Sequence, residues 1–159
     1  KQREFFNQLG LYTAPELRLP VGTPSAFGEI DNLRVSPLQM ILAFAPLSND
    51  GVRPAPRIAL AVDTPAQGWV ILPANGDPLK VLEEAKSHQV AESLRASDQP
   101  FWRSGARSTE KGKSFTWFVA GTLPNWQGTP LVLIVLLEED NAPLANSIGE
   151  ALLIEALEP

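Results

Sequence analysis

The sequence predicts an α+β fold, in which an antiparallel sheet late in the chain packs against helices. The segment 115–123 alternates between two faces, as a strand does. Its two sets of side chains are Phe115, Trp117 and Val119, and Thr116, Phe118 and Ala120. Residues 131–137 are apolar throughout, as in a strand covered on both faces. A loop of hairpin length, residues 124–130, joins the two strands.

The N-terminal part, residues 1–57, is predicted to be helical and loop-like. Residues 1–9 indicate a short helix that Gly10 ends, and residues 11–35 are rich in proline and glycine and indicate a loop. A second helix begins after Ser36. Ser36 is a good N-cap, Pro37 suits the first helical position, and Gln39 completes a capping box.

Residues 58–159 are predicted to mix strands and helices within the same single unit. Residues 58–62 and 69–72 favour a small hairpin. A helix is predicted from Asp77-Pro78, broken near His88 and resuming to Leu94. Its inward side chains are expected to be Leu79, Leu82 and Ala85. A final helix is predicted from Pro143, and its inward side chains are expected to be Leu144, Ile148, Leu152 and Leu157.

The composition of the 159 residues excludes several classes of site. There is no cysteine, which rules out disulfides, thiolate catalysis and cysteine-bound metals, and a single histidine argues against a histidine-based zinc site. A net charge of −5 argues against a nucleic-acid-binding surface. The longest apolar run, residues 131–137, is far short of the roughly 20 residues of a membrane helix. Any export signal or membrane anchor is therefore expected upstream of this chain.

Two short motifs between residues 108 and 114 imitate active-site signatures. Gly112-Lys113-Ser114 lacks the glycine five positions earlier that a phosphate-binding loop requires, since Arg107 stands there. Ser108-Thr109-Glu110-Lys111 has the letters of a Ser-x-x-Lys nucleophile pair, which works when one helical turn brings the amine beside the hydroxyl. It lies in a polar stretch just before Gly112, which favours an exposed surface segment. For Gly112-Lys113-Ser114, the favoured interpretation is a solvated turn between two strands.

The segment Arg103-Ser104-Gly105-Ala106 is better placed, because it would lie on the strand preceding residues 115–123. An edge strand that offers a cation, a hydroxyl and free backbone N–H groups can bind a carboxylate and stabilise an oxyanion. On these residues alone, a surface arginine and a serine at a strand end is the favoured interpretation.

Other polar and aromatic residues carry weaker signals. His88 is predicted to be a helix-surface residue, with no carboxylate or serine at a telling spacing. Glu138-Glu139-Asp140 indicates a turn before a helix N-terminus rather than a metal site. The four tryptophans are interpreted as core and rim aromatics.

The order of these segments resembles the C-terminal portion of the transpeptidase domains of penicillin-binding proteins, in the serine acyl-transferase and β-lactamase superfamily. "LRVSPLQMILAFAPLSNDGVRPAPRI" (residues 33–58) looks like the family's (Thr/Ser)-Pro-Leu-Gln-Met helix, Asn-x-Gly turn and following strand. "FFNQLGLYTAPELRLP" precedes it and resembles the family's Leu-Gly-Leu helix end. "WFVAGTLP" (residues 117–124) resembles the Trp-Phe-x-Gly-x-x-Pro strand, and "LVLIVLLEEDNAPLANSIGEALLIEAL" the last strand and helix. The helix motif is the more specific signal, and the similarity is collinear over almost the whole chain.

The resemblance implies roles for four residues. Arg103-Ser104-Gly105 falls in the slot of the family's Lys-(Thr/Ser)-Gly strand. Arg103 would then supply positive charge to the carboxylate of a D-Ala-D-Ala stem peptide or a β-lactam, and Ser104 would donate a hydrogen bond to it. The backbone N–H of Ala106 would form half of an oxyanion hole. Because neighbouring strand residues point to opposite faces, Arg103 and Ser104 need not touch the same ligand atom.

Two departures from the family pattern limit this interpretation. Arginine keeps the charge of the family's lysine but cannot shuttle a proton, although some β-lactamases of the superfamily carry arginine there. The catalytic Ser-x-x-Lys and Ser-x-Asn motifs are absent, and Ser48-Asn49-Asp50 does not supply the second. No catalytic residue is therefore expected in this chain, and it is predicted to be inactive alone.

The first functional hypothesis is part of a D,D-transpeptidase domain for peptidoglycan cross-linking, with its nucleophile in an upstream half and no cofactor. The second is a non-catalytic relative that binds or scaffolds in the cell envelope. A third, an unrelated small-molecule binding module, predicts a different arrangement of helices and sheet. The resemblance implies the extracytoplasmic face of a bacterial membrane. An uncovered sheet edge could also pair two copies of the chain into a dimer.

Overall fold

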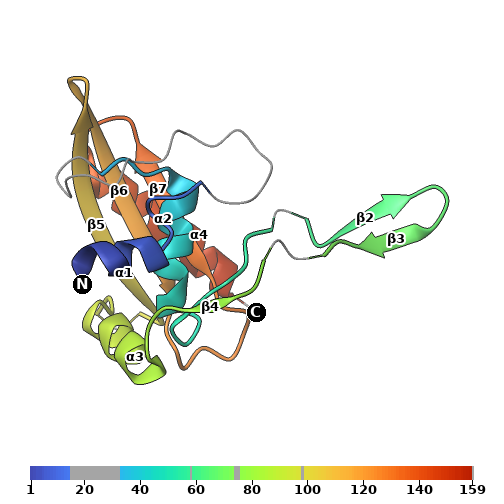
Figure 1. The fold of residues 1–159 in the computed structure, drawn as a ribbon. Coiled ribbons are helices and arrows are strands. Elements are labelled where there is room, and N and C mark those ends of the chain that lie inside the picture. The colour runs from blue at the N-terminus through green and yellow to red at the C-terminus, as the bar shows by residue number, and fades with distance from the viewer. Residues whose placement is uncertain (15–32, 58, 74–75, 98, 159) are drawn as a thin grey trace.

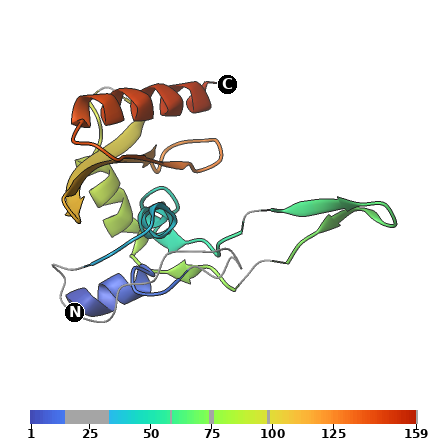
Figure 2. The same cartoon turned by 90° about the horizontal axis from the view of Figure 1, so that it is seen from above.

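The computed structural model describes residues 1–14, 33–57, 59–73, 76–97 and 99–158, and its centre is a three-stranded antiparallel sheet (Figure 1). The strands β5 (Phe101–Glu110), β6 (Lys113–Thr122) and β7 (Val132–Leu137) lie in the order β5-β6-β7. Helix α4 (Ala142–Leu157) covers one face of the sheet, and helix α2 (Pro37–Phe44) lies on the other side (Figure 2). The α+β prediction is confirmed.

The face of the sheet under α4 is closed by small helix residues against aromatic strand residues. Phe101, Phe118 and Ala120 are buried against Ala145 and Leu153. A Cβ built on Gly149 would lie 2.1 Å from Cδ1 and Cε1 of Phe118. Glycine at this position therefore lets the helix backbone approach the Phe118 ring.

The opposite face packs against α2, the 3₁₀ turn η2 (Ala45–Leu47) and helix α3 (Glu84–Ser93). Its core contains Leu47, Ala91, Trp102, Val119 and Leu123. Ser48 ties the layers together, because its hydroxyl accepts from Trp102 Nε1 at 2.9 Å and donates to the carbonyl of Thr122 at 2.8 Å. This face of the sheet thus has a buried polar link as well as apolar packing.

The solvated turn predicted at Gly112-Lys113-Ser114 is a two-residue hairpin loop at Lys111-Gly112, and Lys113 and Ser114 already belong to β6. Lys111 and Gly112 both have positive φ, at 51° and 78°, which is the geometry that matches the twist of the flanking strands. Ser108 is on a strand and accepts a hydrogen bond from Trp117 Nε1 at 2.9 Å. Ser108 and Lys111 therefore do not form a helical Ser-x-x-Lys pair, and Gly112-Lys113-Ser114 does not form a phosphate-binding loop.

The start of α2 follows the sequence signals. Ser36 Oγ accepts from the Gln39 N–H, the Gln39 side chain accepts from the Ser36 N–H, and Pro37 opens the helix. Gln39 is buried, and its side-chain nitrogen also donates to the carbonyls of Leu11 and Thr13. The capping residue therefore also fixes the segment that follows helix α1 (Gln2–Gln8). Residues 15–32, within the predicted loop, lie outside the described part.

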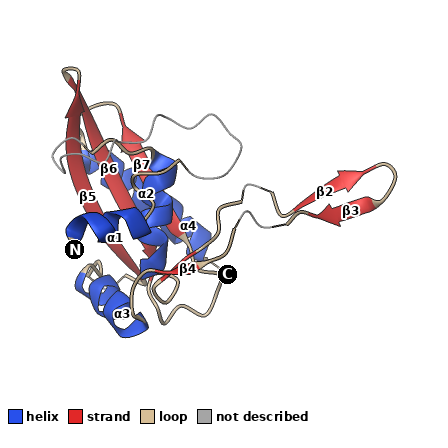
Figure 3. Ribbon diagram, viewed as in Figure 1, coloured by secondary structure: helices blue, strands red, loops and turns tan. Residues whose placement is uncertain are grey.

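A long hairpin projects from the body of the molecule (Figure 3). It consists of β2 (Ala61–Thr64) and β3 (Gly68–Ile71), which confirms the predicted pairing with shifted ends. Ile58, the predicted first residue, lies outside the described residues. At its base, β1 (Val52–Arg53) pairs with β4 (Leu79–Lys80).

The prediction for residues 77–94 is wrong in two respects. The helix begins at Glu84 rather than at Asp77-Pro78, because the Gly51 carbonyl accepts the N–H groups of Val81 and Leu82 and holds that segment extended. Leu79 is on strand β4 and exposed, and Ala85 is exposed. The helix also continues through His88 to Ser93, and the buried Ser87 hydroxyl fixes it to the Pro46 carbonyl by a hydrogen bond of 2.7 Å.

The inward face predicted for the last helix is wrong for Leu144 and Leu152 and right for Leu157, which packs against the core under α4. Leu144 and Leu152 are exposed, whereas Ala145, Gly149 and Leu153 are buried. The buried residues share the same i, i+4 spacing but are shifted by one position from the leucines. The prediction favoured large apolar side chains, and the tight approach to Phe118 requires small ones.

Candidate functional site

The candidate site is the segment of β5 from Arg103 to Arg107, which lies at an edge of the sheet. Two cavities flank it. One, of about 480 Å³, is lined by residues that include Met40, Ala106, Phe115 and Trp117. The other, of about 470 Å³, adjoins the start of α4 and is lined by residues that include Arg103, Gly105 and Asn146.

The backbone of β5 presents every second N–H to the open edge. The Arg103 N–H donates to the Leu94 carbonyl at 3.0 Å, and the Phe101 carbonyl accepts from Ala96, so these odd-numbered residues bond away from β6. Because bonding direction alternates along an antiparallel strand, Gly105 and Arg107 also direct their N–H groups outward. Ala106, opposite Trp117, directs its N–H toward β6. This register corrects the expectation for Ala106: the amide at the open edge within the motif is that of Gly105.

Arg103 lies on the α4 face, where its guanidinium forms an ion pair with Glu150 Oε1. Its neighbour on the same face, Arg107, pairs with Asp140, with Nε 2.9 Å from Oδ1. Both arginines therefore have a protein carboxylate as partner. The cation expected to receive a ligand carboxylate is engaged with helix α4.

Ser104 lies on the other face of the sheet, because neighbouring residues of a strand point to opposite faces. The buried Trp102, two residues earlier, lies on the same face as Ser104. It is half-buried, and its hydroxyl has no hydrogen-bond partner among the described residues. Of the side chains of Arg103 and Ser104, only that of Ser104 is uncommitted. The structure confirms that the motif is on an edge strand before β6, and it separates the two side chains by face.

Ser48, in Ser48-Asn49-Asp50, is committed to structure. It is buried between Trp102 and Thr122 and uses its hydroxyl both as donor and as acceptor. Such a hydroxyl cannot also serve as a proton-transfer group at the surface. Its role is to hold the 48–51 turn against the sheet.

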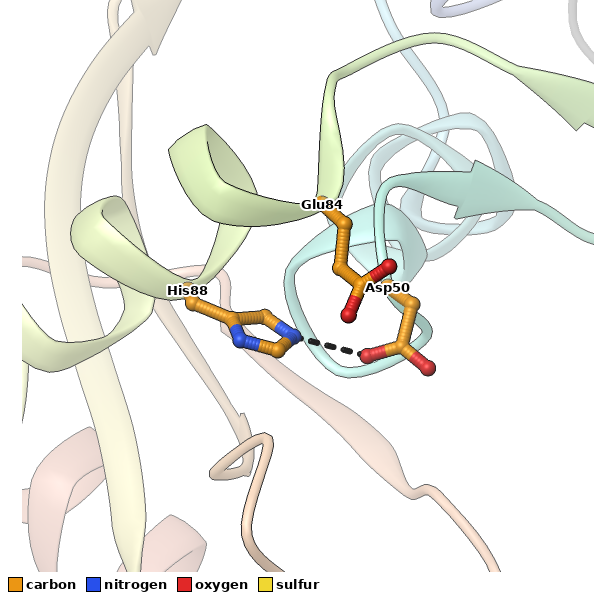
Figure 4. Close-up of side chains that lie close together, drawn as sticks. All are labelled: Asp50, Glu84 and His88. Carbon is orange, nitrogen blue, oxygen red and sulfur yellow. Dashed lines mark hydrogen bonds and ion pairs between the residues drawn. The ribbon is translucent and has the colours of Figure 1, made fainter.

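A second polar cluster, which the sequence analysis missed, joins α3 to that turn (Figure 4). Asp50, Glu84 and His88 each offer one ligand atom, and these atoms lie within 4.8 Å of one another. His88 Nε2 lies 2.8 Å from Asp50 Oδ1. The expectation that His88 had no carboxylate at a telling spacing was wrong. Glu84 lies four residues before it on the same helix, and Asp50 reaches it only through the fold.

The other edge of the sheet is also open among the described residues. β7 pairs with β6 alone, although its six residues are all apolar and half-buried. An apolar strand of this kind is typical of a sheet interior. Side chains of β7 pack against the core clusters on both faces of the sheet, which confirms the coverage predicted from the sequence. The outer edge of β7 has no strand partner among the described residues.

Comparison of the sequence finds no matching family model and no significantly similar curated protein. The fold, in contrast, matches solved structures. Penicillin-binding protein A from Mycobacterium tuberculosis matches with a TM-score of 0.78 and 16% identity, over 98% of this chain and 43% of that one. Penicillin-binding protein 3 from the same organism matches with a TM-score of 0.72 and 17% identity, over 98% and 46%.

A D,D-transpeptidase domain of a peptidoglycan glycosyltransferase from Eggerthella lenta gives a TM-score of 0.66 and 14% identity, over 98% of this chain and 48% of that one. The chain thus spans less than half the length of these structures. Among the described helices, none has the length and hydropathy to cross a membrane. The resemblance drawn from the sequence is confirmed at the level of fold: the described residues of this chain share the fold of part of a penicillin-binding transpeptidase domain.

Proposed function

We propose that this chain is the C-terminal portion of a penicillin-binding-type D,D-transpeptidase domain, and that it binds an extended peptide end or a β-lactam along β5. The observation that carries the proposal is the open edge of β5, where the Gly105 N–H faces outward next to the uncommitted Ser104 hydroxyl. Its setting would be the extracytoplasmic face of a bacterial membrane, with peptidoglycan stem peptides as substrate.

An extended peptide would bind by adding a strand to this edge. Main-chain hydrogen bonds from the outward-facing groups of Gly105 and Arg107 would give affinity, and the pocket beside the strand would give specificity. The Gly105 amide would donate to the carbonyl oxygen under attack, where negative charge develops. The Ser104 hydroxyl would donate to the ligand carboxylate. Two of the structurally similar proteins were solved with a β-lactam, in three structures: penicillin-binding protein 3 with aztreonam and with ampicillin, and penicillin-binding protein A as an imipenem acyl-enzyme.

The nucleophile would come from outside these residues. The Ser108 and Lys111 pair is on a strand end and a turn, so no lysine amine is positioned to activate a serine there. The open edge of β7 and the cavity beside Met40 offer the surface on which an upstream half would complete the domain. Two copies pairing along β7 are the competing occupant of that edge.

A non-catalytic envelope protein is the second candidate. It is favoured by one observation, the ion pair between Arg103 and Glu150, which removes the motif's cation from the ligand side of the strand. In that case the strand edge would bind a peptide without acyl transfer.

Fluorescent penicillin distinguishes the two candidates. The full-length parent and the 159-residue chain are each incubated with it, and covalent label is read by gel and intact mass. Label on the parent and none on the short chain is the expected result. A folded parent without label contradicts the catalytic proposal, and label on the short chain contradicts the assignment of the nucleophile to another segment.

A further inference from the structure

We propose that Asp50, Glu84 and His88 form a binding site for a divalent transition-metal ion, with Zn²⁺ as the natural probe. This site lies on the surface between the 48–51 turn and α3 (Figure 4). It is distinct from the β5 edge and does not depend on whether the chain takes part in catalysis.

The three ligands come from two elements. Glu84 and His88 are four residues apart on α3, so their side chains lie on one face of the helix. Asp50 faces them from the turn, where it adopts a positive φ of 50°. Aspartate is one of the few residues other than glycine that tolerates this conformation. The turn geometry therefore directs the Asp50 carboxylate to the helix.

The distances suit a small ion with short bonds. Zn²⁺ binds imidazole nitrogen and carboxylate oxygen at about 2.0–2.2 Å, which places neighbouring ligand atoms of a tetrahedral site about 3.4 Å apart. His88 Nε2 and Asp50 Oδ1 lie 2.8 Å apart, and all three ligand atoms lie within 4.8 Å of one another. Rotation of the exposed carboxylates brings the set to that spacing. A fourth position remains for water.

The donor set selects the class of ion. Imidazole suits zinc, copper, iron and nickel, whereas Mg²⁺ and Ca²⁺ prefer oxygen alone. His88 is the single histidine of the chain, so the site has one nitrogen and two carboxylates. Two carboxylates neutralise the charge of the ion, which favours binding to this acidic surface.

Hydrogen bonds tie together the two segments that carry the ligands. The buried Ser87 hydroxyl donates to the Pro46 carbonyl at 2.7 Å, and the Gly51 carbonyl accepts from Val81 and Leu82. A Cβ on Gly51 would lie 2.2 Å from the Leu82 carbonyl oxygen, which shows how closely the two segments approach. The ion would therefore find its ligands in place, with only side-chain rotation to fix.

Metal binding at this site would also stabilise the contact of the turn with the sheet, through Ser48. Ser48 lies two residues before Asp50 and holds Trp102 and Thr122 by hydrogen bonds. An ion that fixes Asp50 against α3 would also restrain this turn. Metal binding is thus expected to raise the melting temperature of the chain, because the folded form binds the ion and the unfolded form lacks the site.

The test is a Zn²⁺ titration of the purified chain, followed by calorimetry and by the imidazole C–H signals of its single histidine. Saturable binding of one ion with a shifted or broadened His88 signal is expected, and Mg²⁺ should leave that signal unchanged. Asp50→Asn, which keeps a residue that tolerates the turn conformation, and Glu84→Gln should each weaken Zn²⁺ binding by at least about tenfold. Loss of a residue that only supports a metal ligand already weakens binding by about 10–100-fold, so loss of a ligand should weaken it at least as much.

Glu92→Gln is the matched control, since Glu92 is an exposed carboxylate on the same helix that pairs with Arg95 instead. It should bind Zn²⁺ as the unmodified chain does, and circular dichroism checks that every variant is folded. A His88 signal that does not respond to Zn²⁺ overturns the proposal. So does unchanged affinity in Asp50→Asn and Glu84→Gln, which would show binding by the imidazole alone.

Discussion

The two faces of the β5-β6-β7 sheet differ in how they are closed. Under α4, apolar residues pack tightly around Phe118, and the strand arginines Arg103 and Arg107 have carboxylate partners. On the α2 side, packing is dense around Trp102 and Leu47 but gives way beyond Ala106 to a cavity of about 480 Å³. The α4 face also has a cavity beside β5, of about 470 Å³, but the two arginines that border it already have carboxylate partners. From this difference we infer that the ligand of the proposed function contacts the other face and the β5 edge.

Ser48→Ala should have the largest effect on stability. It leaves the buried Trp102 Nε1–H and the Thr122 carbonyl without a partner, and each such loss costs about 1–3 kcal/mol, so about 2–6 kcal/mol in total is expected. Urea denaturation measures the change. Ser93→Ala, at an exposed hydroxyl that donates to Val90, is the control and should change little. An unchanged midpoint in Ser48→Ala would show that the α2 face does not depend on this link.

A pair of proline substitutions tests the direction of the β5 backbone. Ala106→Pro removes an N–H that points into the ladder with β6, so a loss of about 1–3 kcal/mol is expected. Gly105→Pro removes an N–H at the open edge, where proline is tolerated, and should cost less. Urea denaturation ranks the two variants. The reverse ranking would mean that Ala106 faces the edge, as the sequence analysis expected.

Gly149→Ala tests the closeness of α4 to the sheet. Alanine normally stabilises a helix interior by about 1 kcal/mol relative to glycine. Here its Cβ would meet the buried Phe118 ring, and such overpacking costs about 1–3 kcal/mol, so net destabilisation is expected. Thermal unfolding decides the sign. Stabilisation of the variant would show that the α4 face has room, and Ser147→Ala on the exposed side of α4 serves as the control.

Glu150→Gln should have the smallest effect. It removes the negative partner of Arg103, and because both side chains are partly exposed, a loss of about 0.2–1 kcal/mol is expected. Thermal unfolding at low and high salt measures it, and the difference from the unmodified chain should shrink as salt rises. A difference that is large and independent of salt would mean that the pair is more buried than its exposure indicates.

Local signals predicted the elements with a strong chemical signature. The capping box of Ser36 and Gln39 and the alternation of residues 115–123 formed as their residue types indicate. A turn formed at Gly112 as well, but one residue earlier than the predicted Gly112-Lys113-Ser114. The start of α3 was missed because hydrogen bonds to Gly51, distant in sequence, override the helix signal at Asp77-Pro78. The α4 face was misassigned because the fit of Gly149 against Phe118 is a tertiary property.

The candidate site was predicted in position but not in detail. The sequence placed Arg103-Ser104-Gly105 on the strand before β6, which is where it lies. Which face each side chain takes, and which amide points outward, depends on the hairpin register and on the bond from Arg103 to Leu94. The partner of Arg103, Glu150, is 47 residues away and carries no local signal.

The acylation rate of the full-length parent by fluorescent penicillin tests the central claim most directly. Ser104→Ala should slow labelling by about tenfold or more, since a hydrogen bond to a charged group contributes about 1.5–3 kcal/mol. Arg103→Ala should label within about threefold of the unmodified parent, because its partner is Glu150 rather than the ligand. Loss of labelling in Arg103→Ala with normal labelling in Ser104→Ala would contradict the assignment of the α4 face to structure and of the β5 edge to ligand binding.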